Sequence, residues 1–372
     1  MSHQKSSGIN YAPKGKANPV VKPGEFRFAA AALDHGHIYG MCNGLIEAGA
    51  VCCGVYDPNP KKVAAFLKVY PDIPVADNFD ALLEDSSIQM IAAAAIPCER
   101  CELGIKVMDS GKDYFTDKAP LTTLGQLSLA REAVTRTRRK YMVYYSERLH
   151  VESAVLTGQL IKEGAIGNVV QVINLAPHRL SPDERPDWFW SREMSGGILC
   201  DLGSHQIEQF LYYSGNRSAK IVSSHLCNYT RPQNPDFDDF GEANLIGENG
   251  AAQYLRVDWL NPDGLGAWGD GRLFILGTAG FIEVRKYIDV ARQAEGDQIY
   301  LVDHQSERHI SAAGTVGFPF FGELILDCLN RTENAMTQEH AFAAAELGVR
   351  VQAEAVRIHA NIGEKNNGIC SI

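Results

Sequence analysis

Between residues 25 and 148, short apolar runs alternate with segments whose apolar residues recur at helical spacing. The runs carry few polar side chains, which is typical of strands buried on both faces of a parallel sheet. Strand–helix alternation of this kind predicts a doubly wound α/β domain, in which ligands bind beyond the carboxyl ends of the strands. The predicted strands are Phe26–Leu33, Val51–Tyr56, Met90–Ile96, Asp113–Thr116 and Tyr141–Tyr145.

From residue 149 onward few helical segments separate the apolar runs, and polar and apolar positions alternate within them. We expect an α+β domain over residues 149–350, with a mostly antiparallel open sheet and helices on one face, followed by a C-terminal helix and tail over residues 351–372. A second subunit is the simplest cover for the open face, so a homodimer or homotetramer is expected. The predicted strands are Val169–Asn174, Ala219–Asn228, Glu242–Gly247, Ala251–Trp259, Arg272–Gly277 and Phe281–Arg285, and the predicted helices are Glu152–Glu163, Asp201–Tyr213 and Phe342–Ala360.

Composition narrows the class of protein. The 372 residues include 35 Lys and Arg against 45 Asp and Glu, a formal net charge of −10. An acidic surface repels phosphate backbones and anionic headgroups, so neither a nucleic-acid nor a membrane partner is expected. Nine scattered cysteines and a polar first stretch without a secretory apolar core predict a reduced, cytoplasmic protein. Residues 1–24 are expected to form an arm on the surface or on a neighbouring subunit.

The turn after the first predicted strand has features of a dinucleotide-binding loop. Gly36 adds little bulk where the N-terminus of a helix would meet a pyrophosphate, although Ala32 replaces the first glycine of the usual fingerprint. Asp57 ends the second strand about 20 residues later, the offset of a carboxylate that accepts ribose hydroxyls and repels a 2′-phosphate. NAD is therefore expected rather than NADP. Lys61 and Lys62 lie near enough to weaken that preference, and capping of the next helix is the alternative role of Asp57.

Two histidines, His35 and His37, flank Gly36 in this turn. Such a pair can bind a metal ion, but beside a predicted pyrophosphate site we expect the rings to line the cofactor and no metal to be bound. The residues expected to contact the cofactor are Asp34, His35, Gly36, His37, Ile38, Asp57, Ile96, Pro97 and Lys118.

Three residues are candidates for proton transfer. Lys118 follows the fourth predicted strand, where a side chain points into the ligand crevice unless it simply lies on the surface. Asp201 and His205 are four residues apart in a predicted helix and share a face. A histidine beside a carboxylate is the usual pair for moving a hydroxyl proton. The alternative interpretation of this pair is a helix cap and a packed histidine.

Taken together, these motifs resemble a known family, the glucose–fructose oxidoreductase, inositol dehydrogenase and rhizopine-catabolism group (Gfo/Idh/MocA), over roughly residues 26–360. The matching segments are the turn at 32–40, Asp57, Asp117-Lys118 where the family has Glu-Lys-Pro, and the Gly-Gly to Asp-x-Gly-x-His run from Gly196 to His205. The resemblance implies an N-terminal Rossmann domain, with Lys118 contacting nicotinamide ribose and substrate. It also implies that His205 is the acid/base and that Asp201 orients the substrate or the histidine. Asp117 in place of glutamate, Ala119 in place of proline and the altered turn depart from the family and leave the cofactor geometry open.

All four tryptophans lie in two segments, residues 178–190 and 258–270, which also carry cations and acids. Sugars stack on aromatic rings and hydrogen-bond to such groups, whereas the alternative role of the tryptophans is packing in the core or at an interface. The first segment leads to the catalytic helix. We therefore expect His178, Arg179, Trp188 and Asp201 to bind substrate, with Arg179 suited to a carboxylate.

The expected function is an NAD-dependent oxidoreductase that moves a hydride between nicotinamide and the hydroxyl or keto carbon of a sugar, polyol or sugar acid. An NAD-dependent glycosidase or lyase that uses transient oxidation needs the same residues, and a net change in NADH absorbance distinguishes the two. A ligand-sensing regulator of the same fold is the third possibility. Lys118 and His205 argue against it, because a binding protein has no need of a proton-transfer pair.

Overall fold

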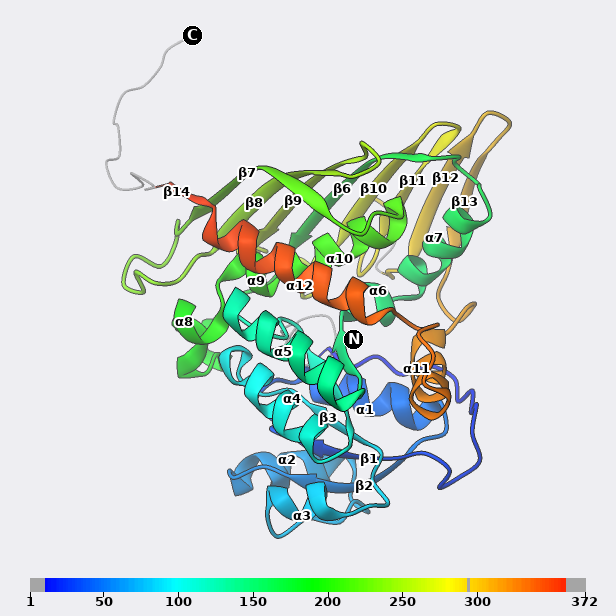
Figure 1. Cartoon of the computed structure of the whole chain (residues 1–372). Helices are drawn as coiled ribbons and strands as arrows, with labels where there is room; N and C mark the ends of the chain where they lie inside the picture. Colours follow the sequence, from blue (N-terminus) through cyan, green and yellow to red (C-terminus); the bar gives the residue numbers. More distant parts are fainter. Residues whose placement is uncertain (1–10, 293–294, 359–372) are drawn as a thin grey trace.

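The computed structural model describes residues 11–292 and 295–358, and its N-terminal domain contains the predicted doubly wound sheet (Figure 1). Five parallel strands have the order β2-β1-β3-β4-β5, so the direction of strand addition reverses between β1 and β3. Ligands bind at such a reversal, beyond the carboxyl ends of the strands. The strands are β1 Arg27–Ala31, β2 Val51–Tyr56, β3 Met90–Ala93, β4 Asp113–Asp117 and β5 Tyr141–Tyr144.

The helices of this domain differ in how they begin. Helices α2, α3 and α5 start at Asn59, Asn78 and Thr123, whose side chains each accept a backbone N–H of the first turn. Helix α1 starts at Gly36, which has no side chain to cap it, and the N–H of His37 donates instead to Nδ1 of His35. The N-terminus of α1 follows β1 and lies at the edge of the sheet where a ligand is expected. The helices are α1 His37–Glu47, α2 Pro60–Val69, α3 Phe79–Glu84, η3 Pro97–Glu99, α4 Arg100–Asp109, α5 Leu124–Thr137 and α6 Ser146–Leu149.

The second domain is built on a nine-stranded sheet of order β13-β12-β11-β10-β6-β9-β8-β7-β14. Most neighbours are antiparallel, as predicted, but β6 pairs with β9 and β7 with β14 in parallel. The strands are β6 Val169–Pro177, β7 Ala219–Cys227, β8 Phe240–Gly247, β9 Ala252–Asp258, β10 Arg272–Gly277, β11 Gly280–Arg285, β12 Gln298–Asp303, β13 Glu307–Ser311 and β14 Val356–Ile358.

Helices α9, α10 and α12 lie between this sheet and the N-terminal domain (Figure 1). Alternate residues of β8, β9 and β10 are buried beneath them, which produces the two-residue periodicity in the sequence. The remaining helices are α7 Glu152–Lys162, η4 Pro182–Glu184, η5 Asp187–Trp190, α8 Arg192–Ser195, α9 Ile198–Asp201, α10 Gly203–Ser214, α11 Pro319–Asn330 and α12 Gln338–Ala353.

The end of the described chain differs from the prediction. The helix expected over Phe342–Ala360 begins earlier, at Gln338, where the Thr337 side chain caps it, and it ends at Ala353. The chain then forms β14, because Val356–Ile358 finds unpaired backbone groups along the edge of β7. Of the C-terminal helix and tail expected over residues 351–372, residues 351–353 are helical as the end of α12, residues 356–358 form a strand, and residues 359–372 lie outside the described part of the chain.

Residues 11–24 run as an irregular segment from α1 to the second domain. Backbone N–H groups of Asn18 and Val20 donate to the carbonyls of Glu47 and Ala48 at the end of α1. At the other end of the segment, the ring of Tyr11 packs against Trp268, with centroids 5.3 Å apart. The segment therefore links the two domains along one side. The first ten residues of the expected arm lie outside the described residues.

Among the described residues, no helix combines the length and the apolar character needed to cross a bilayer.

The face of the large sheet that the helices leave uncovered is partly apolar. Ile173 of β6 pairs in register with Phe274 of β10, whose ring stacks on Phe281 at 5.3 Å. Leu276 and Ile246 on the same sheet are 38% and 44% exposed. Contiguous apolar surface of this kind marks interfaces, and we expect a second copy of the chain to cover it.

Replacing Phe274 with Asp is therefore expected to convert a homo-oligomer into a monomer, because a carboxylate at the centre of the apolar face opposes its burial. Light scattering at micromolar concentration measures the change in mass. The matched control is Val69→Asp, which places the same charge on exposed α2 in the other domain and is expected to leave the mass unchanged. A wild-type protein that is already a monomer would contradict the prediction.

Candidate active site

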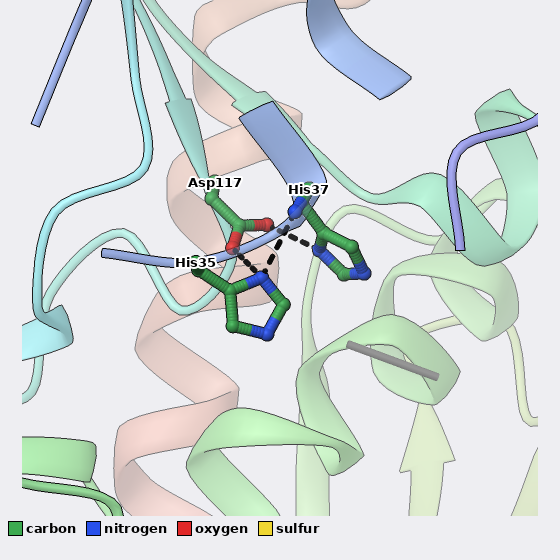
Figure 2. Close-up of side chains that lie close together, drawn as sticks. All are labelled: His35, His37 and Asp117. Carbon is green, nitrogen blue, oxygen red and sulfur yellow. Dashed lines mark hydrogen bonds and ion pairs between the residues drawn. The ribbon is translucent and has the colours of Figure 1, made fainter. Parts of the chain in front are cut away.

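Asp117, the last residue of β4, is a buried carboxylate at the carboxyl edge of the parallel sheet. Its Oδ1 lies 2.8 Å from Nδ1 of His37 (Figure 2). The same oxygen accepts the backbone N–H of Lys118 at 2.8 Å. Its Oδ2 lies 3.2 Å from Nδ1 of His35 and accepts from the Arg100 guanidinium at 3.3 Å. Burial raises the pKa of Asp117, but the interactions with His37, Arg100 and His35 outweigh it and hold that pKa well below its usual value. The ionised carboxylate therefore ties the turn after β1 to the start of α4.

His35, His37 and Asp117 present atoms within 4.8 Å of one another, a spacing that a metal ion could use. The hydrogen bonds argue against that use. The backbone N–H of His37 donates to Nδ1 of His35 at 3.2 Å, so this lone pair already has a proton. The guanidinium of Arg100 already pairs with Asp117, so the carboxylate does not need a metal ion to balance its charge. The cluster therefore fits a hydrogen-bonded anchor better than a metal site.

Lys118 reaches from this anchor to the second domain. Arg100 donates to the carbonyl oxygens of Lys118 and Ala119, the latter at 3.0 Å, and so orients the backbone that carries the lysine. The side chain of Lys118 is 4% exposed and forms an ion pair with Asp201 at the end of α9. The family resemblance implied that Asp201 orients the substrate or His205. A buried ammonium without a counter-ion is costly, and this explains why the carboxylate pairs with the lysine.

His205 lies in the first turns of α10 and is 2% exposed. Its ring is 6.4 Å from that of His37 and 6.2 Å from that of Tyr145. Burial, with the nearby charge of Lys118, lowers the pKa of His205 to about 3, although Glu147 acts in the opposite direction. Nδ1 of His205 has no hydrogen-bond partner among the described residues. The ring is therefore neutral near pH 7.

Glu147, in α6 after β5, is the acidic residue of the site that the sequence reasoning missed. It is 2% exposed, and its Oε2 accepts from Nζ of Lys286 and from the side-chain amide of Gln206, each at 3.0 Å. Its Oε1 lies 3.7 Å from Nε2 of His178. Burial raises the pKa of Glu147, but Lys286, His205 and His178 together hold it below its usual value. Its position after a strand at the same edge as Lys118 was the available signal.

A pocket opens between the two domains beside this cluster. Seven residues that were predicted to belong to the site line it: His35, His37, Pro97, Lys118, His178, Trp188 and Asp201. The sequence reasoning did not select the other lining residues, which are Arg100, Arg185, Pro186, Phe189, Leu202 and Trp259. Burial lowers the pKa of His178 to about 4, so this imidazole is neutral near pH 7. The pocket thus combines aromatic walls with a few convergent polar groups, the usual composition of a small-molecule site.

Arg179 does not line this pocket, contrary to the sequence prediction. His178 and Arg179 form bridges to different segments, to Gly269 and Leu260, and neighbouring residues in extended backbone point to opposite sides. The Arg179 guanidinium instead donates to the carbonyl of Leu265 at 2.7 Å.

The edge of the sheet expected to hold adenosine carries two carboxylates and one ammonium. Asp57 accepts the backbone N–H groups of Leu33 at 2.7 Å and Asn59 at 2.8 Å, and its side chain is 1% exposed. Lys62 lies 2.5 Å from Asp34 and 3.9 Å from Asp57. Asp57 therefore stabilises the turn after β1 and the start of α2, in addition to any contact with a ribose.

The remaining predicted cofactor residues differ in their environment. Gly36 precedes α1, and Pro97 lines the pocket. Ile96 lies just before η3 and is partly buried. Ile38 is 1% exposed and packs in the hydrophobic core, so its side chain contributes to the support of α1.

This arrangement, a parallel nucleotide-binding sheet joined to an open-sheet domain with a lysine and a histidine at their junction, defines a two-domain oxidoreductase. Residues 37–145 match the oxidoreductase family model with the NAD-binding Rossmann fold, and residues 156–283 match the GFO/IDH/MocA C-terminal domain. The chain belongs to the Gfo/Idh/MocA family of oxidoreductases, as the sequence motifs indicated.

Solved structures agree with this assignment. A putative oxidoreductase from Erwinia carotovora atroseptica SCRI1043 is 49% identical, with a TM-score of 0.87 over 90% of this chain and 100% of that one. Levoglucosan dehydrogenase in complex with NADH shares the fold, at 17% identity and a TM-score of 0.73 over 89% of this chain and 98% of that one.

Curated relatives are more distant. The putative oxidoreductase YteT of Bacillus subtilis (strain 168) is 23% identical over 48% of this chain and 43% of its own length. The D-xylose dehydrogenase of Paenarthrobacter nicotinovorans is 22% identical over 40% of this chain and 39% of its own. The matched region therefore spans less than half of these two curated relatives.

The anchor at Asp117 predicts a large effect on stability. Asp117→Asn leaves Arg100 buried without its carboxylate, and loss of one partner of a buried pair lowers the free energy of unfolding by about 3–5 kcal/mol. Urea unfolding at pH 7 measures it. The control Asp80→Asn removes an exposed ion pair with Lys106, at 2.6 Å, and is expected to change stability by less than about 1 kcal/mol. Equal effects of the two substitutions would show that Asp117 is no anchor.

Proposed function

We propose that the protein transfers a hydride between a nicotinamide cofactor and the hydroxyl or keto carbon of a sugar, polyol or sugar acid. The observation that carries the proposal is the approach of Lys118 and His205 from different domains. Lys118 lines the pocket, and the buried ring of His205 lies 6.4 Å from the ring of His37, another lining residue. The charge of Lys118 also lowers the pKa of His205. An ammonium in the pocket wall and a neutral imidazole next to that wall suit proton transfer at a hydroxyl group. A protein that only sensed a ligand would have no use for this pair.

The N-terminus of α1 fits the pyrophosphate of such a cofactor. Its first turn contains no acidic residue, so the positive end of the helix dipole favours an anion, while the N–H of His37 already donates to Nδ1 of His35 and those of Ile38 and Tyr39 donate to backbone carbonyls. Pro97 and Lys118 follow neighbouring strands and are suited to contact the nicotinamide half. When bound, the cofactor supplies the hydride acceptor or donor.

The chain's own residues supply the proton chemistry. In the oxidising direction, neutral His205 accepts the proton of the substrate hydroxyl while the carbon loses its hydride, which leaves a carbonyl group. Lys118 hydrogen-bonds to the same oxygen and stabilises the negative charge that develops on it. Asp201 holds the ammonium in place through the ion pair. In the reducing direction the proton returns from His205 to the carbonyl oxygen.

The shape of the pocket supports a carbohydrate-like substrate. Trp188 and Trp259 provide flat apolar walls, and His178 and Asp201 provide polar groups. Relatives named as D-xylose dehydrogenase and as scyllo-inositol 2-dehydrogenase (NADP(+)) act on this class of molecule by name, and they support the same class here.

Removal of His205 is the direct test of this chemistry. His205→Ala is expected to lower kcat about 10²–10⁴-fold on the best member of a panel of sugars, polyols and sugar acids, because a positioned acid/base contributes that much. NADH affinity, followed by tryptophan fluorescence, should change little. Lys118→Ala should lower both kcat and the affinity for NADH. His309→Ala, on the exposed strand β13, is the control.

A second prediction concerns how kcat/KM for the same reaction depends on pH. The sequence alone suggested a rate that rises near pH 6.5, the ordinary pKa of histidine. Because burial lowers the pKa of His205 to about 3, the base form is already present at pH 5, and kcat/KM for oxidation should show no histidine limb near 6.5. A limb near 6.5 that disappears in His205→Ala would contradict this environment for His205.

The two carboxylates at the adenosine edge support NAD as the preferred cofactor. Among the described residues, Asp34 and Asp57 share one ammonium within ion-pair distance, that of Lys62, so the local charge opposes a 2′-phosphate. The structures of related proteins include both NADH- and NADP-bound members.

Fluorescence titration is expected to give tighter binding of NADH than of NADPH. Asp34→Asn should reduce this preference about tenfold by removing the more exposed carboxylate, which is equivalent to ~1.4 kcal/mol. Lys62→Ala should increase the preference. Equal binding of the two cofactors by the wild type would show that Lys62, rather than the carboxylates, governs the choice.

A further inference from the structure

Arg185, in the loop between η4 and η5, is held rigidly at the wall of the pocket. Its guanidinium stacks on Phe189 and Trp259, at 4.7 Å from each ring centroid. Nε donates to the carbonyl of Leu180 at 2.7 Å and one terminal nitrogen donates to that of Arg179 at 3.2 Å. The other terminal nitrogen has no hydrogen-bond partner among the described residues, and the side chain lines the pocket together with Lys118. Such fixation leaves one donor edge oriented for a ligand.

The charges around the pocket leave Arg185 without a counter-ion. Arg100 has Asp117 and Lys118 has Asp201. No described carboxylate forms an ion pair with Arg185, although Asp201 and Glu184 are near enough to raise its pKa. Burial outweighs them and lowers that pKa to about 10, so the guanidinium is still charged at pH 7. One positive charge in the pocket is therefore uncompensated.

We infer that Arg185 binds a carboxylate of the substrate, so that the substrate class is a sugar acid rather than a neutral sugar or polyol. This inference rests on the proposed function and narrows it. A guanidinium that is already desolvated against aromatic rings loses little more hydration when it pairs with an anion, and hydrogen bonds of this charge-assisted kind are strong. The carboxylate would lie at Arg185, while a hydroxyl elsewhere on the same molecule would meet Lys118 and His205.

Two other anions fit less well. A phosphate monoester carries close to two negative charges at pH 7, whereas the pocket has one uncompensated positive charge. The pyrophosphate of a dinucleotide is expected at the N-terminus of α1, in the other domain. The role that the sequence assigned to Arg179 as a carboxylate ligand thus belongs to Arg185, because Arg179 faces Leu265 outside the pocket.

Matched ligands test the inference by binding rather than by turnover. Calorimetry in the presence of saturating NADH would compare gluconate with glucitol, glucuronate with glucose, and galacturonate with galactose, with glucose 6-phosphate as the phosphate arm. At least one acid is expected to bind the wild type at least about tenfold more tightly than its neutral partner and than the phosphate. Arg185→Gln should abolish that difference, since it removes one charge-assisted bond. Arg185→Lys, which keeps the charge, should retain part of it.

Arg179→Gln is the matched control, because it neutralises the neighbouring arginine outside the pocket, and it should leave the preference intact. Thermal unfolding and NADH affinity of each variant report on folding and on the cofactor site. The inference is overturned if no acid exceeds its neutral partner, if the phosphate binds as tightly as the acids, or if Arg185→Gln weakens NADH as much as the acid. Oxidation of a neutral sugar by a protein that shows no preference for acids would overturn this inference and leave the proposed function standing.

Discussion

The structure depends on one buried charge, the carboxylate of Asp117. A carboxylate in the protein interior is stable only when donors satisfy its oxygens, and here His37, Arg100 and the backbone of Lys118 do so. These donors come from the turn after β1, the start of α4 and the residue that follows β4. One ion therefore fixes the relative positions of the cofactor turn and the catalytic lysine. A glutamate in the same position would carry its carboxyl group one methylene farther from the backbone. The shorter side chain of Asp117 leaves room for the rings of His35 and His37.

The second constraint acts across the domain boundary. The ammonium of Lys118 from the first domain pairs with Asp201 from the second. The helix that carries His205 is in turn packed between the large sheet and α12. On the far side of the pocket, Glu147 holds Lys286 and faces His178. Each cation of the pocket except Arg185 is thus matched by an acid of the protein. That exception is the basis of the proposed preference for an anionic ligand.

The sequence predicted the fold well because buried parallel strands and half-exposed antiparallel strands leave different periodicities. It also identified Lys118, Asp201, His178 and Trp188, which line the pocket, and His205, whose ring lies 6.4 Å from that of His37, a lining residue. It failed where the outcome depended on long-range contacts. The spacing of Asp201 and His205 placed them on one helix face but could not reveal that a lysine 83 residues away takes the carboxylate. Neighbouring residues in extended backbone face opposite ways, so His178 lines the pocket whereas Arg179 does not. The sequence analysis gave no role to Arg185, which does line the pocket. The strand β14 depends on a free edge of β7, which no local pattern records.

The central claim is that Lys118 and His205 act on one substrate oxygen. A crystal structure with NADH and the tightest-binding member of the ligand panel tests it most directly. The account predicts a ligand hydroxyl or carbonyl oxygen within about 2.6–3.2 Å of both Lys118 Nζ and a ring nitrogen of His205, the range required for catalytic proton transfer. A ligand oxygen that contacts neither group, or a separation of Lys118 Nζ and the His205 ring beyond ~10 Å in the complex, would contradict it, since no single oxygen could then reach both.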